Sequence, residues 1–294
     1  MPAHENIGAV KPEIELTWRD GFALAYQVYG EGERDLVYPP GYESNVDRMW
    51  DVAAYRSFLE SLATLGRLIT HDRRGLGCSD RLAPGSAATV EEGRDDLLAV
   101  LDAAGSRRAT IVAVQEAVFV ALLLAATHPA RVDRLVLFGA TPSYAWSEDL
   151  PDGWTEQQWD DELGAWASVE NLTGFIEEHA RSLAPSLDGD ADELRALGSL
   201  LLSTESIGAA VADARQLSGV DMRPVLASVS APTLVIRRAD DAAASPSSGR
   251  YLAEHIVDGE YVEVPGADSL PWLGDRGPVV DAIALAMRSE SAGR

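Results

Sequence analysis

Residues 111–118 read Ile-Val-Ala-Val-Gln-Glu-Ala-Val, and this stretch decides how the chain folds. The four residues before the polar pair Gln115–Glu116 favour a buried strand. The apolar run that resumes at Ala117 and continues to Ala126 favours a buried helix. The stretch therefore predicts a strand, a sharp turn and a helix in direct succession, with Gln115 at the turn.

A turn of this kind is typical of a nucleophile elbow, in which a Gly-x-Ser-x-Gly sequence exposes a serine hydroxyl. Here Ala113 and Ala117 occupy the two glycine positions, and Gln115 occupies the serine position. A carboxamide is not a nucleophile at neutral pH. The local sequence thus predicts the shape of an elbow without the group that an elbow normally presents.

Composition limits the classes of protein to which the chain can belong. It has 294 residues, a formal net charge of −23 and one cysteine, Cys78. The length predicts one large domain, or one domain with an insertion. The negative charge would repel phosphate backbones and anionic lipids, so we expect neither nucleic-acid nor membrane partners.

The lone cysteine predicts no disulfide framework, and we expect no metal site and no cofactor. Without a secretory leader or a long apolar run, the sequence predicts a cytoplasmic protein, monomeric or homodimeric.

Strand and helix patterns alternate along most of the chain. The sequence predicts a hairpin at 13–17 and 22–29, strands at 35–38, 68–71, 134–138, 232–236 and 260–264, and helices at 45–65, 89–105, 247–256 and 277–287. This alternation predicts an α/β fold with a mostly parallel central sheet and helices on both faces. No strand pattern appears between Thr141 and about Arg223, where tryptophan-rich helical segments lie instead. We expect a core of residues 1–140 and 225–294, a helical lid of residues 141–224, and disorder at 289–294.

Several motifs link this pattern to a known family. They are Pro40-Gly41-Tyr42, Asp72-Arg73-Arg74-Gly75-x-Gly77-x-Ser79-Asp80, the elbow at 113–117, His128-Pro129-x-Arg131-Val132, the strand at 232–236 leading to Asp240-Asp241, and Pro265-Gly266-Ala267-Asp268-Ser269-Leu270-Pro271-Trp272. With them the chain resembles the α/β-hydrolase family over nearly everything outside the lid. The resemblance implies the α/β-hydrolase fold with a helical lid inserted between two strands.

The resemblance also implies where a catalytic triad would stand. Family members carry a serine at the elbow, a carboxylate after the strand that follows the lid, and a histidine after the last strand. Here these positions hold Gln115, Asp241 and Ser269. Serine attack needs an imidazole to remove the hydroxyl proton, and Ser269 cannot act as that base. We therefore expect no covalent serine catalysis.

Backbone donors survive the replacement of side chains. The resemblance implies an oxyanion hole made by the N–H groups of Tyr42 and Glu116, so a site for a carbonyl or enolate oxygen is expected to remain. Gln115 would add a side-chain donor and acceptor beside it. The alternative is that Gln115 fills the former serine volume and bonds Ser269 or Asp241. Carboxylates, Glu116 among them, are the remaining candidates for a general base.

Neighbouring residues are candidates for substrate binding. Gly41 and Glu43 flank Tyr42, Trp146 and Trp154 lie nearest the lid hinge, and Trp272 follows Ser269 closely. Aromatic walls with a few polar anchors are typical of small-molecule pockets.

Two further residues are expected to have structural roles. Arg73 is expected to form an ion pair with Asp72, and Cys78 to fill a small buried space.

Three functions remain open at this point. The first is an enzyme of cyclase, lyase or isomerase type that acts on a small hydrophobic oxygenated molecule in specialised metabolite biosynthesis. The second is a non-catalytic protein that binds a small ligand. The third is a hydrolase whose water is activated directly by Asp241 or Glu116, although an ordinary carboxylate is a weak base at neutral pH.

Overall fold

One eight-stranded sheet organises the molecule. The computed structural model describes residues 11–39 and 41–288, so the disorder expected at 289–294 falls outside the described residues. The strands are β1 (Glu15–Arg19), β2 (Phe22–Tyr29), β3 (Asp35–Tyr38), β4 (Arg67–His71), β5 (Ala109–Val114), β6 (Val132–Phe138), β7 (Thr233–Arg238) and β8 (Gly259–Val264). Their order in the sheet is β1-β2-β4-β3-β5-β6-β7-β8. The two pairings of β2 are antiparallel and the other five are parallel, which confirms the predicted mostly parallel sheet.

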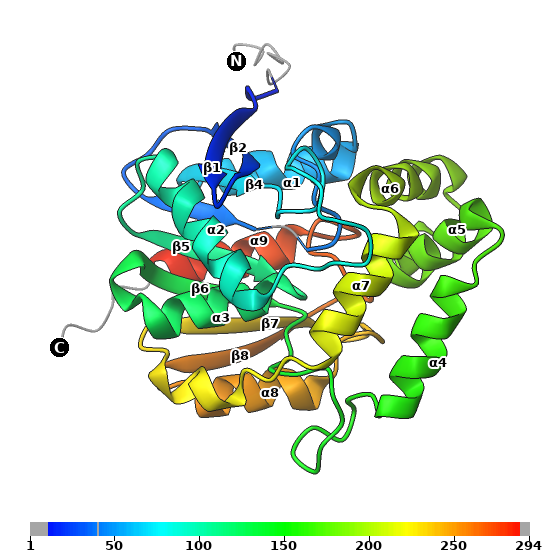
Figure 1. Ribbon diagram of the computed structural model, residues 1–294. Coiled ribbons are helices and arrows are strands. Elements are labelled where there is room, and N and C mark those ends of the chain that lie inside the picture. Colours follow the sequence, from blue (N-terminus) through cyan, green and yellow to red (C-terminus); the bar gives the residue numbers. More distant parts are fainter. Residues whose placement is uncertain (1–10, 40, 289–294) are drawn as a thin grey trace.

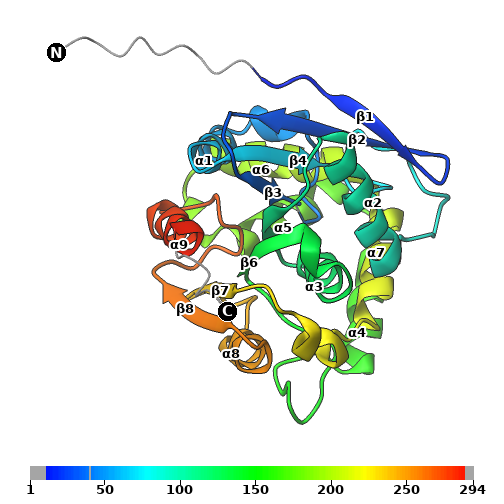
Figure 2. The same ribbon diagram turned by 90° about the vertical axis from the view of Figure 1, so that its left-hand side faces the viewer.

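Helices cover both faces of this sheet, as Figure 2 shows. They are α1 (Ala53–Ala63) and α9 (Gly277–Arg288) on one face, with α2 (Val90–Ala103), α3 (Ala117–Thr127) and α8 (Pro246–His255) on the other. Each face buries its own apolar core because the central strands carry apolar residues on both sides. The result is a three-layer α/β architecture.

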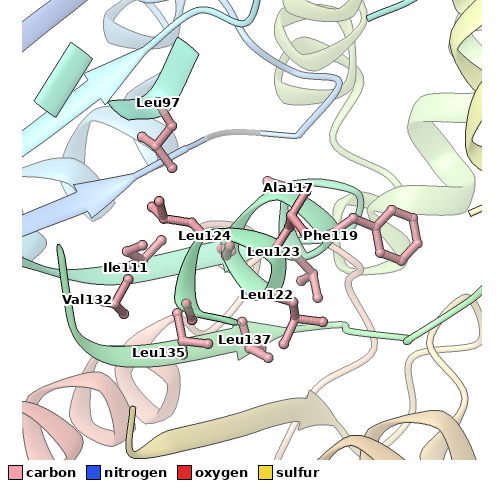
Figure 3. Close-up of a cluster of buried hydrophobic side chains, with 14 of the residues drawn as sticks. Leu97, Ile111, Ala117, Phe119, Leu122, Leu123, Leu124, Val132, Leu135 and Leu137 are labelled. Atoms are coloured by element: carbon pink, nitrogen blue, oxygen red, sulfur yellow. The ribbon is translucent and has the colours of Figure 1, made fainter. Parts of the chain in front are cut away.

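The helix α3 that follows the elbow lies in the middle of one core. It is apolar all round, and eight of its residues are buried. Figure 3 shows Leu122 of α3 beside Leu137 of β6, with Leu135 further along the same strand. A helix buried on every side fixes the direction in which the preceding turn points.

Short-range signals explain where elements begin. The β1–β2 turn has positive φ at both central residues, 51° at Asp20 and 84° at Gly21, as a type I′ hairpin turn requires. At α2, Thr89 accepts from the Glu92 N–H and the Glu92 side chain accepts from the Thr89 N–H, which forms a capping box.

The predicted helix at 45–65 was wrong in its first part. Residues Arg48–Trp50 form a single 3₁₀ turn, and α1 begins only at Ala53. The reason is local: Oδ1 of Asn45 accepts from the backbone N–H groups of Asp47 and Arg48, an Asx-type turn that competes with helical hydrogen bonding.

Four helices, which we call the lid helices, lie between β6 and β7 in the chain. They are α4 (Glu156–Ala167), α5 (Leu172–Leu183), α6 (Ala191–Thr204) and α7 (Ile207–Ser218). Figure 1 shows them gathered beside the sheet layers rather than on a face of the sheet. In the part of the chain that the structure describes, no helix combines the length and apolar character needed to cross a bilayer.

Candidate active site

The elbow has the strained backbone that such turns require. β5 ends at Val114, α3 begins at Ala117, and Gln115 between them has a φ of +49°. Left-handed backbone costs a residue with a Cβ roughly 1–2 kcal/mol, so the packed strand and helix must hold it in place. Ala113 and Ala117 on either side of the turn are 0% and 1% exposed, so both are packed in the core. The sequence therefore builds a genuine elbow around a glutamine.

The three triad positions lie in contact. The Ser269 hydroxyl donates to Oδ1 of Asp241 at 2.8 Å, and the Gln115 amide Nε2 donates to the Ser269 carbonyl oxygen at 3.4 Å. Asp241 also accepts from the Ala243 N–H at 2.9 Å. Because the Ser269 proton is directed at the carboxylate, this chain of contacts contains no group that could take a proton from a nucleophile at position 115. Gln115 keeps its Oε1 atom buried and unpaired within the described structure.

The Glu116 side chain is buried beside the elbow, 5% exposed, and lines the cavity. Burial raises the pKa of the Glu116 carboxyl, while Arg73 and the backbone N–H groups of Glu116 and Tyr42 act in the opposite direction. The backbone N–H groups of Tyr42 and Glu116 are thus close enough to the Glu116 carboxyl to favour its ionised form.

A second carboxyl, Glu43, adjoins Glu116 across Gly41. A Cβ placed on Gly41 would lie 2.9 Å from Oε2 of Glu43 and 3.2 Å from Oε2 of Glu116, so glycine is needed where the two side chains approach the backbone. Glu43 is fully buried, and the Tyr38 hydroxyl donates to its Oε1 at 3.3 Å. Burial, followed by the charge of Glu116, raises the pKa of Glu43 to about 7. The pair can therefore hold a proton near neutral pH.

An ion-pair cluster joins the elbow to the lid. Nη1 of Arg73 lies 3.8 Å from Oε1 of Glu116, and Nη2 of Arg73 hydrogen-bonds Asp213 of α7. Glu205, just before α7, completes the cluster: burial and then the charge of Asp213 raise its pKa to about 8. Arg73 thus pairs with two carboxyl groups, and its charge acts on a third, Glu205.

Two structural roles expected from sequence were wrong. Asp72 does not pair with Arg73; it accepts from the Ser44 hydroxyl and the Val46 N–H, at 2.8 and 2.9 Å. It also accepts from the N–H of Cys78 at 2.6 Å, so it ties its own loop together. Cys78 is exposed and fills no buried space.

One large cavity lies between the elbow and the lid helices. Its volume is about 1480 Å³, above the range of about 300–1,000 Å³ common for small-molecule sites. Its lining includes the predicted residues Tyr42, Gln115, Glu116, Trp154, Asp241 and Ser269, together with Tyr144, Trp159, Trp166, Phe175, His179, Glu205 and Asp213. Gly41 and Glu43 lie behind Glu116 and do not line it. The cavity therefore combines an aromatic wall with a cluster of carboxyl groups.

Two tryptophans do not take the positions that the sequence suggested. Trp272 is fully buried away from the cavity and stacks on Tyr55, with ring centroids 4.5 Å apart and planes 4° apart. It belongs to the core beneath α1, so its assignment to substrate binding is corrected. Trp146 is 52% exposed and does not line the cavity either.

Sequence reasoning missed part of the aromatic wall. His179 of α5 is not among the predicted site residues, yet it lines the cavity, and its ring lies 5.7 Å from that of Tyr42. Trp159 and Trp166 lie seven residues apart on α4 and both line the cavity. That helical spacing puts both on one face and was the available signal. Asp213 and Glu205 offered no comparable pattern.

Comparisons with known proteins agree with this architecture. Residues 36–274 match the family described as the α/β hydrolase fold, so the chain belongs to that family. It is 28% identical over 252 residues to 3-oxoadipate enol-lactonase 1 of Acinetobacter baylyi, covering 84% of this chain and 87% of the relative. It is 25% identical over 246 residues to a strigolactone esterase of Arabidopsis thaliana, covering 82% and 87%.

Two solved structures have the same fold. The crystal structure of a hydrolase from Pseudomonas aeruginosa superposes with a TM-score of 0.78 at 25% identity, covering 94% of this chain and 98% of that one. The enol-lactonase from Burkholderia xenovorans superposes with a TM-score of 0.79 at 20% identity, covering 94% and 100%, and this likeness concerns the fold alone.

Proposed function

We propose that this protein is an enzyme of the α/β-hydrolase family that works by carboxyl acid–base catalysis without a covalent intermediate. The observation that carries the proposal is the contact chain Gln115–Ser269–Asp241, which replaces nucleophile and base by an amide and a hydroxyl. Beside it lie carboxyl groups whose pKa values are raised toward neutrality. Such groups are suited to general acid–base work at neutral pH.

The proposed chemistry is proton transfer next to a carbonyl group. A substrate carbonyl oxygen replaces the Glu116 carboxylate at the N–H groups of Tyr42 and Glu116, where developing negative charge is stabilised. The released carboxylate then takes the proton from the adjacent carbon, and the Gln115 amide helps to orient the resulting enolate. Isomerisation, elimination and cyclisation all proceed through such a step. Glu43 serves as the neighbouring proton store.

The substrate class follows from the cavity lining. Aromatic residues of the lid and core form much of the wall, which suits a hydrophobic molecule that carries oxygen functions. We assign the enzyme to specialised metabolite biosynthesis in the cytoplasm, as a monomer or homodimer without nucleic-acid or membrane partners. The relatives are named as a lactonase and an esterase, names that refer to carbonyl substrates and leave open which step this chain performs.

One probe can separate the three functions. Ethyl 2-oxocyclohexanecarboxylate carries both an exchangeable proton between two carbonyl groups and an ester that can be hydrolysed. In D₂O, NMR follows deuterium uptake and ester cleavage in the same sample. The proposal predicts enzyme-dependent deuterium uptake without ester cleavage.

Variants assign the activity to the site. Glu116→Gln should slow exchange by roughly 100-fold, as loss of a general base does. Gln115→Ala should slow it at least ~10-fold if the amide polarises the substrate. Glu33→Gln is the matched control, because Glu33 is exposed in the β2–β3 turn and does not line the cavity. Ester cleavage that depends on Glu116 would instead favour a carboxylate-assisted hydrolase. Absence of both reactions would contradict the proposal and favour a ligand-binding protein.

A further inference from the structure

We infer that the ligand of this cavity carries a protonated amine, which is held between Glu116 and Glu205. The inference deepens the proposed function by naming a substrate class for the same site. It rests on the charges that line the cavity, on buried acceptor atoms without partners, and on the aromatic rings beside them.

The positive charges on the cavity wall are already engaged by the protein. Three arginines line it: Arg74, Arg81 and Arg237. Arg74 is paired with Asp96, with Nη2 and Oδ1 2.6 Å apart. Arg81 and Arg237 both donate to backbone carbonyl oxygens of their surrounding loops. These guanidinium groups therefore hold loops together and are poorly placed to receive an anionic ligand.

The carboxyl groups beside the elbow are short of partners. Oε1 of Glu116 and Oε2 of Glu205 are buried and accept no hydrogen bond within the described structure. The Glu116 residue as a whole is only 5% exposed. Nη1 of Arg73 lies 3.8 Å from Oε1 of Glu116, beyond hydrogen-bond distance, and Nη2 of Arg73 is already bonded to Asp213. Buried acceptors without donors are costly, so a ligand that brings donors and positive charge would satisfy them.

Aromatic rings surround the same region. Tyr42 and Tyr144 line the cavity beside Glu116, and the charge of Glu116 raises the pKa of both hydroxyls after burial does. The ring of Trp159 lies 6.3 Å from that of Tyr144 and 5.0 Å from that of Trp154. An organic ammonium group is attracted both to ring faces and to carboxylates. The combination is poorly suited to a carboxylate ligand, whose charge would meet Glu116 and Asp213 together.

A metal ion is a less suitable occupant. Among the residues that the structure describes, no group of three or more His, Cys, Asp and Glu side chains is arranged to hold one. Aromatic rings supply none of the hard oxygen ligands that Ca²⁺ or Mg²⁺ prefers. The cation that this lining favours is therefore an organic one.

Three probes of matched shape test the inference by direct binding, independently of turnover. They are 4-phenylbutylamine, 4-phenylbutanol and 4-phenylbutanoate, measured at pH 7.5 by isothermal titration calorimetry with the full chain. The amine should bind at least ~10-fold more tightly than the alcohol, because a charge-assisted hydrogen bond is stronger than a neutral one. The butanoate should bind more weakly than the alcohol.

Variants show whether the two carboxyl groups are responsible. Glu116→Gln and Glu205→Gln should each raise the Kd of the amine by roughly 10-fold, while the Kd of the alcohol changes less than about 2-fold. Glu33→Gln should alter neither. Binding of the butanoate as tightly as the amine, or equal loss of amine and alcohol binding in both variants, would overturn the inference. Selective amine binding without deuterium exchange would retain this inference while rejecting the proposed function.

Discussion

The Ser269 hydroxyl donates a hydrogen bond to Oδ1 of Asp241 at 2.8 Å, where the resemblance to other family members places a histidine beside the acid. The Asp241 side chain is buried, in a residue only 2% exposed, so its carboxylate needs a hydrogen-bond donor even where no triad operates. Serine supplies that donor but no basic nitrogen. The same contact thus keeps the buried carboxylate satisfied and removes the base on which serine catalysis depends.

The elbow strain predicts an order of stability among variants of Gln115. Gln115→Gly and Gln115→Ala both lose the amide, but only glycine adopts a φ of +49° without strain. We expect the glycine variant to be more stable than the alanine variant by about 1 kcal/mol in urea unfolding. Equal stability would show that the turn stores no such strain.

The two tryptophans Trp272 and Trp154 should separate stability from binding. Trp272→Ala removes a fully buried ring stacked on Tyr55 and should lower the free energy of unfolding by about 3–5 kcal/mol. Trp154→Ala affects a ring that is 40% exposed and lines the cavity, so it should weaken probe binding with a smaller loss of stability. Urea unfolding and titration calorimetry check the two expectations, and the reverse pattern would contradict the placement of both rings.

Two glycines with positive φ should respond differently to alanine. At Gly77, with φ +51°, a Cβ would lie 2.2 Å from Oδ2 of Asp72, which is held by several hydrogen bonds. At Gly85, with φ +77°, nothing lies within 4 Å of such a Cβ. Gly85→Ala should therefore show only backbone strain of about 1–2 kcal/mol, and Gly77→Ala a clearly larger loss. Similar losses in urea unfolding would argue against the Asp72 loop geometry.

Glu205 should make stability depend on pH. Its pKa is raised to about 8 by burial and then by Asp213 and Glu116, against the lowering effect of Arg73 and Arg81. A raised carboxyl pKa gives stability that is fully present below the unfolded value near 4.5 and is lost as pH rises through about 8. Glu205→Gln should therefore raise the melting temperature at pH 9 by several degrees and change it little at pH 5. An equal shift at both pH values would mean that Glu205 does not titrate in this range.

Much of the core could be predicted because its signals are local. The elbow, the hairpin turn at Asp20 and Gly21 and the capping box at Thr89 each depend on residues within a few positions of one another. Buried strands also show as apolar runs. These features predict the strands but not their order in the sheet, since periodicity alone does not say which strands are neighbours.

The part of the site that could not be predicted depends on distant contacts. Arg73 meets Asp213 across 140 positions, and no pattern near either residue indicates the other. The orientation of Trp272 was missed because its distance along the chain from Ser269 says nothing of the Tyr55 ring on which it packs. Likewise, the Glu116 side chain could be named from sequence, but its ion pair with Arg73 is a property of the folded chain.

Intact-mass spectrometry after treatment with a serine-directed fluorophosphonate tests most directly whether the protein lacks covalent serine catalysis. We predict that the native chain gains no adduct, because the hydroxyls of the cavity serines Ser203 and Ser269 donate to the Leu200 carbonyl and to Asp241, and within the described residues no histidine ring is hydrogen-bonded to them. The double variant Gln115→Ser with Ser269→His should gain one adduct at position 115, since the elbow turn and Asp241 are already in place. An adduct on a cavity serine of the native chain would contradict the account.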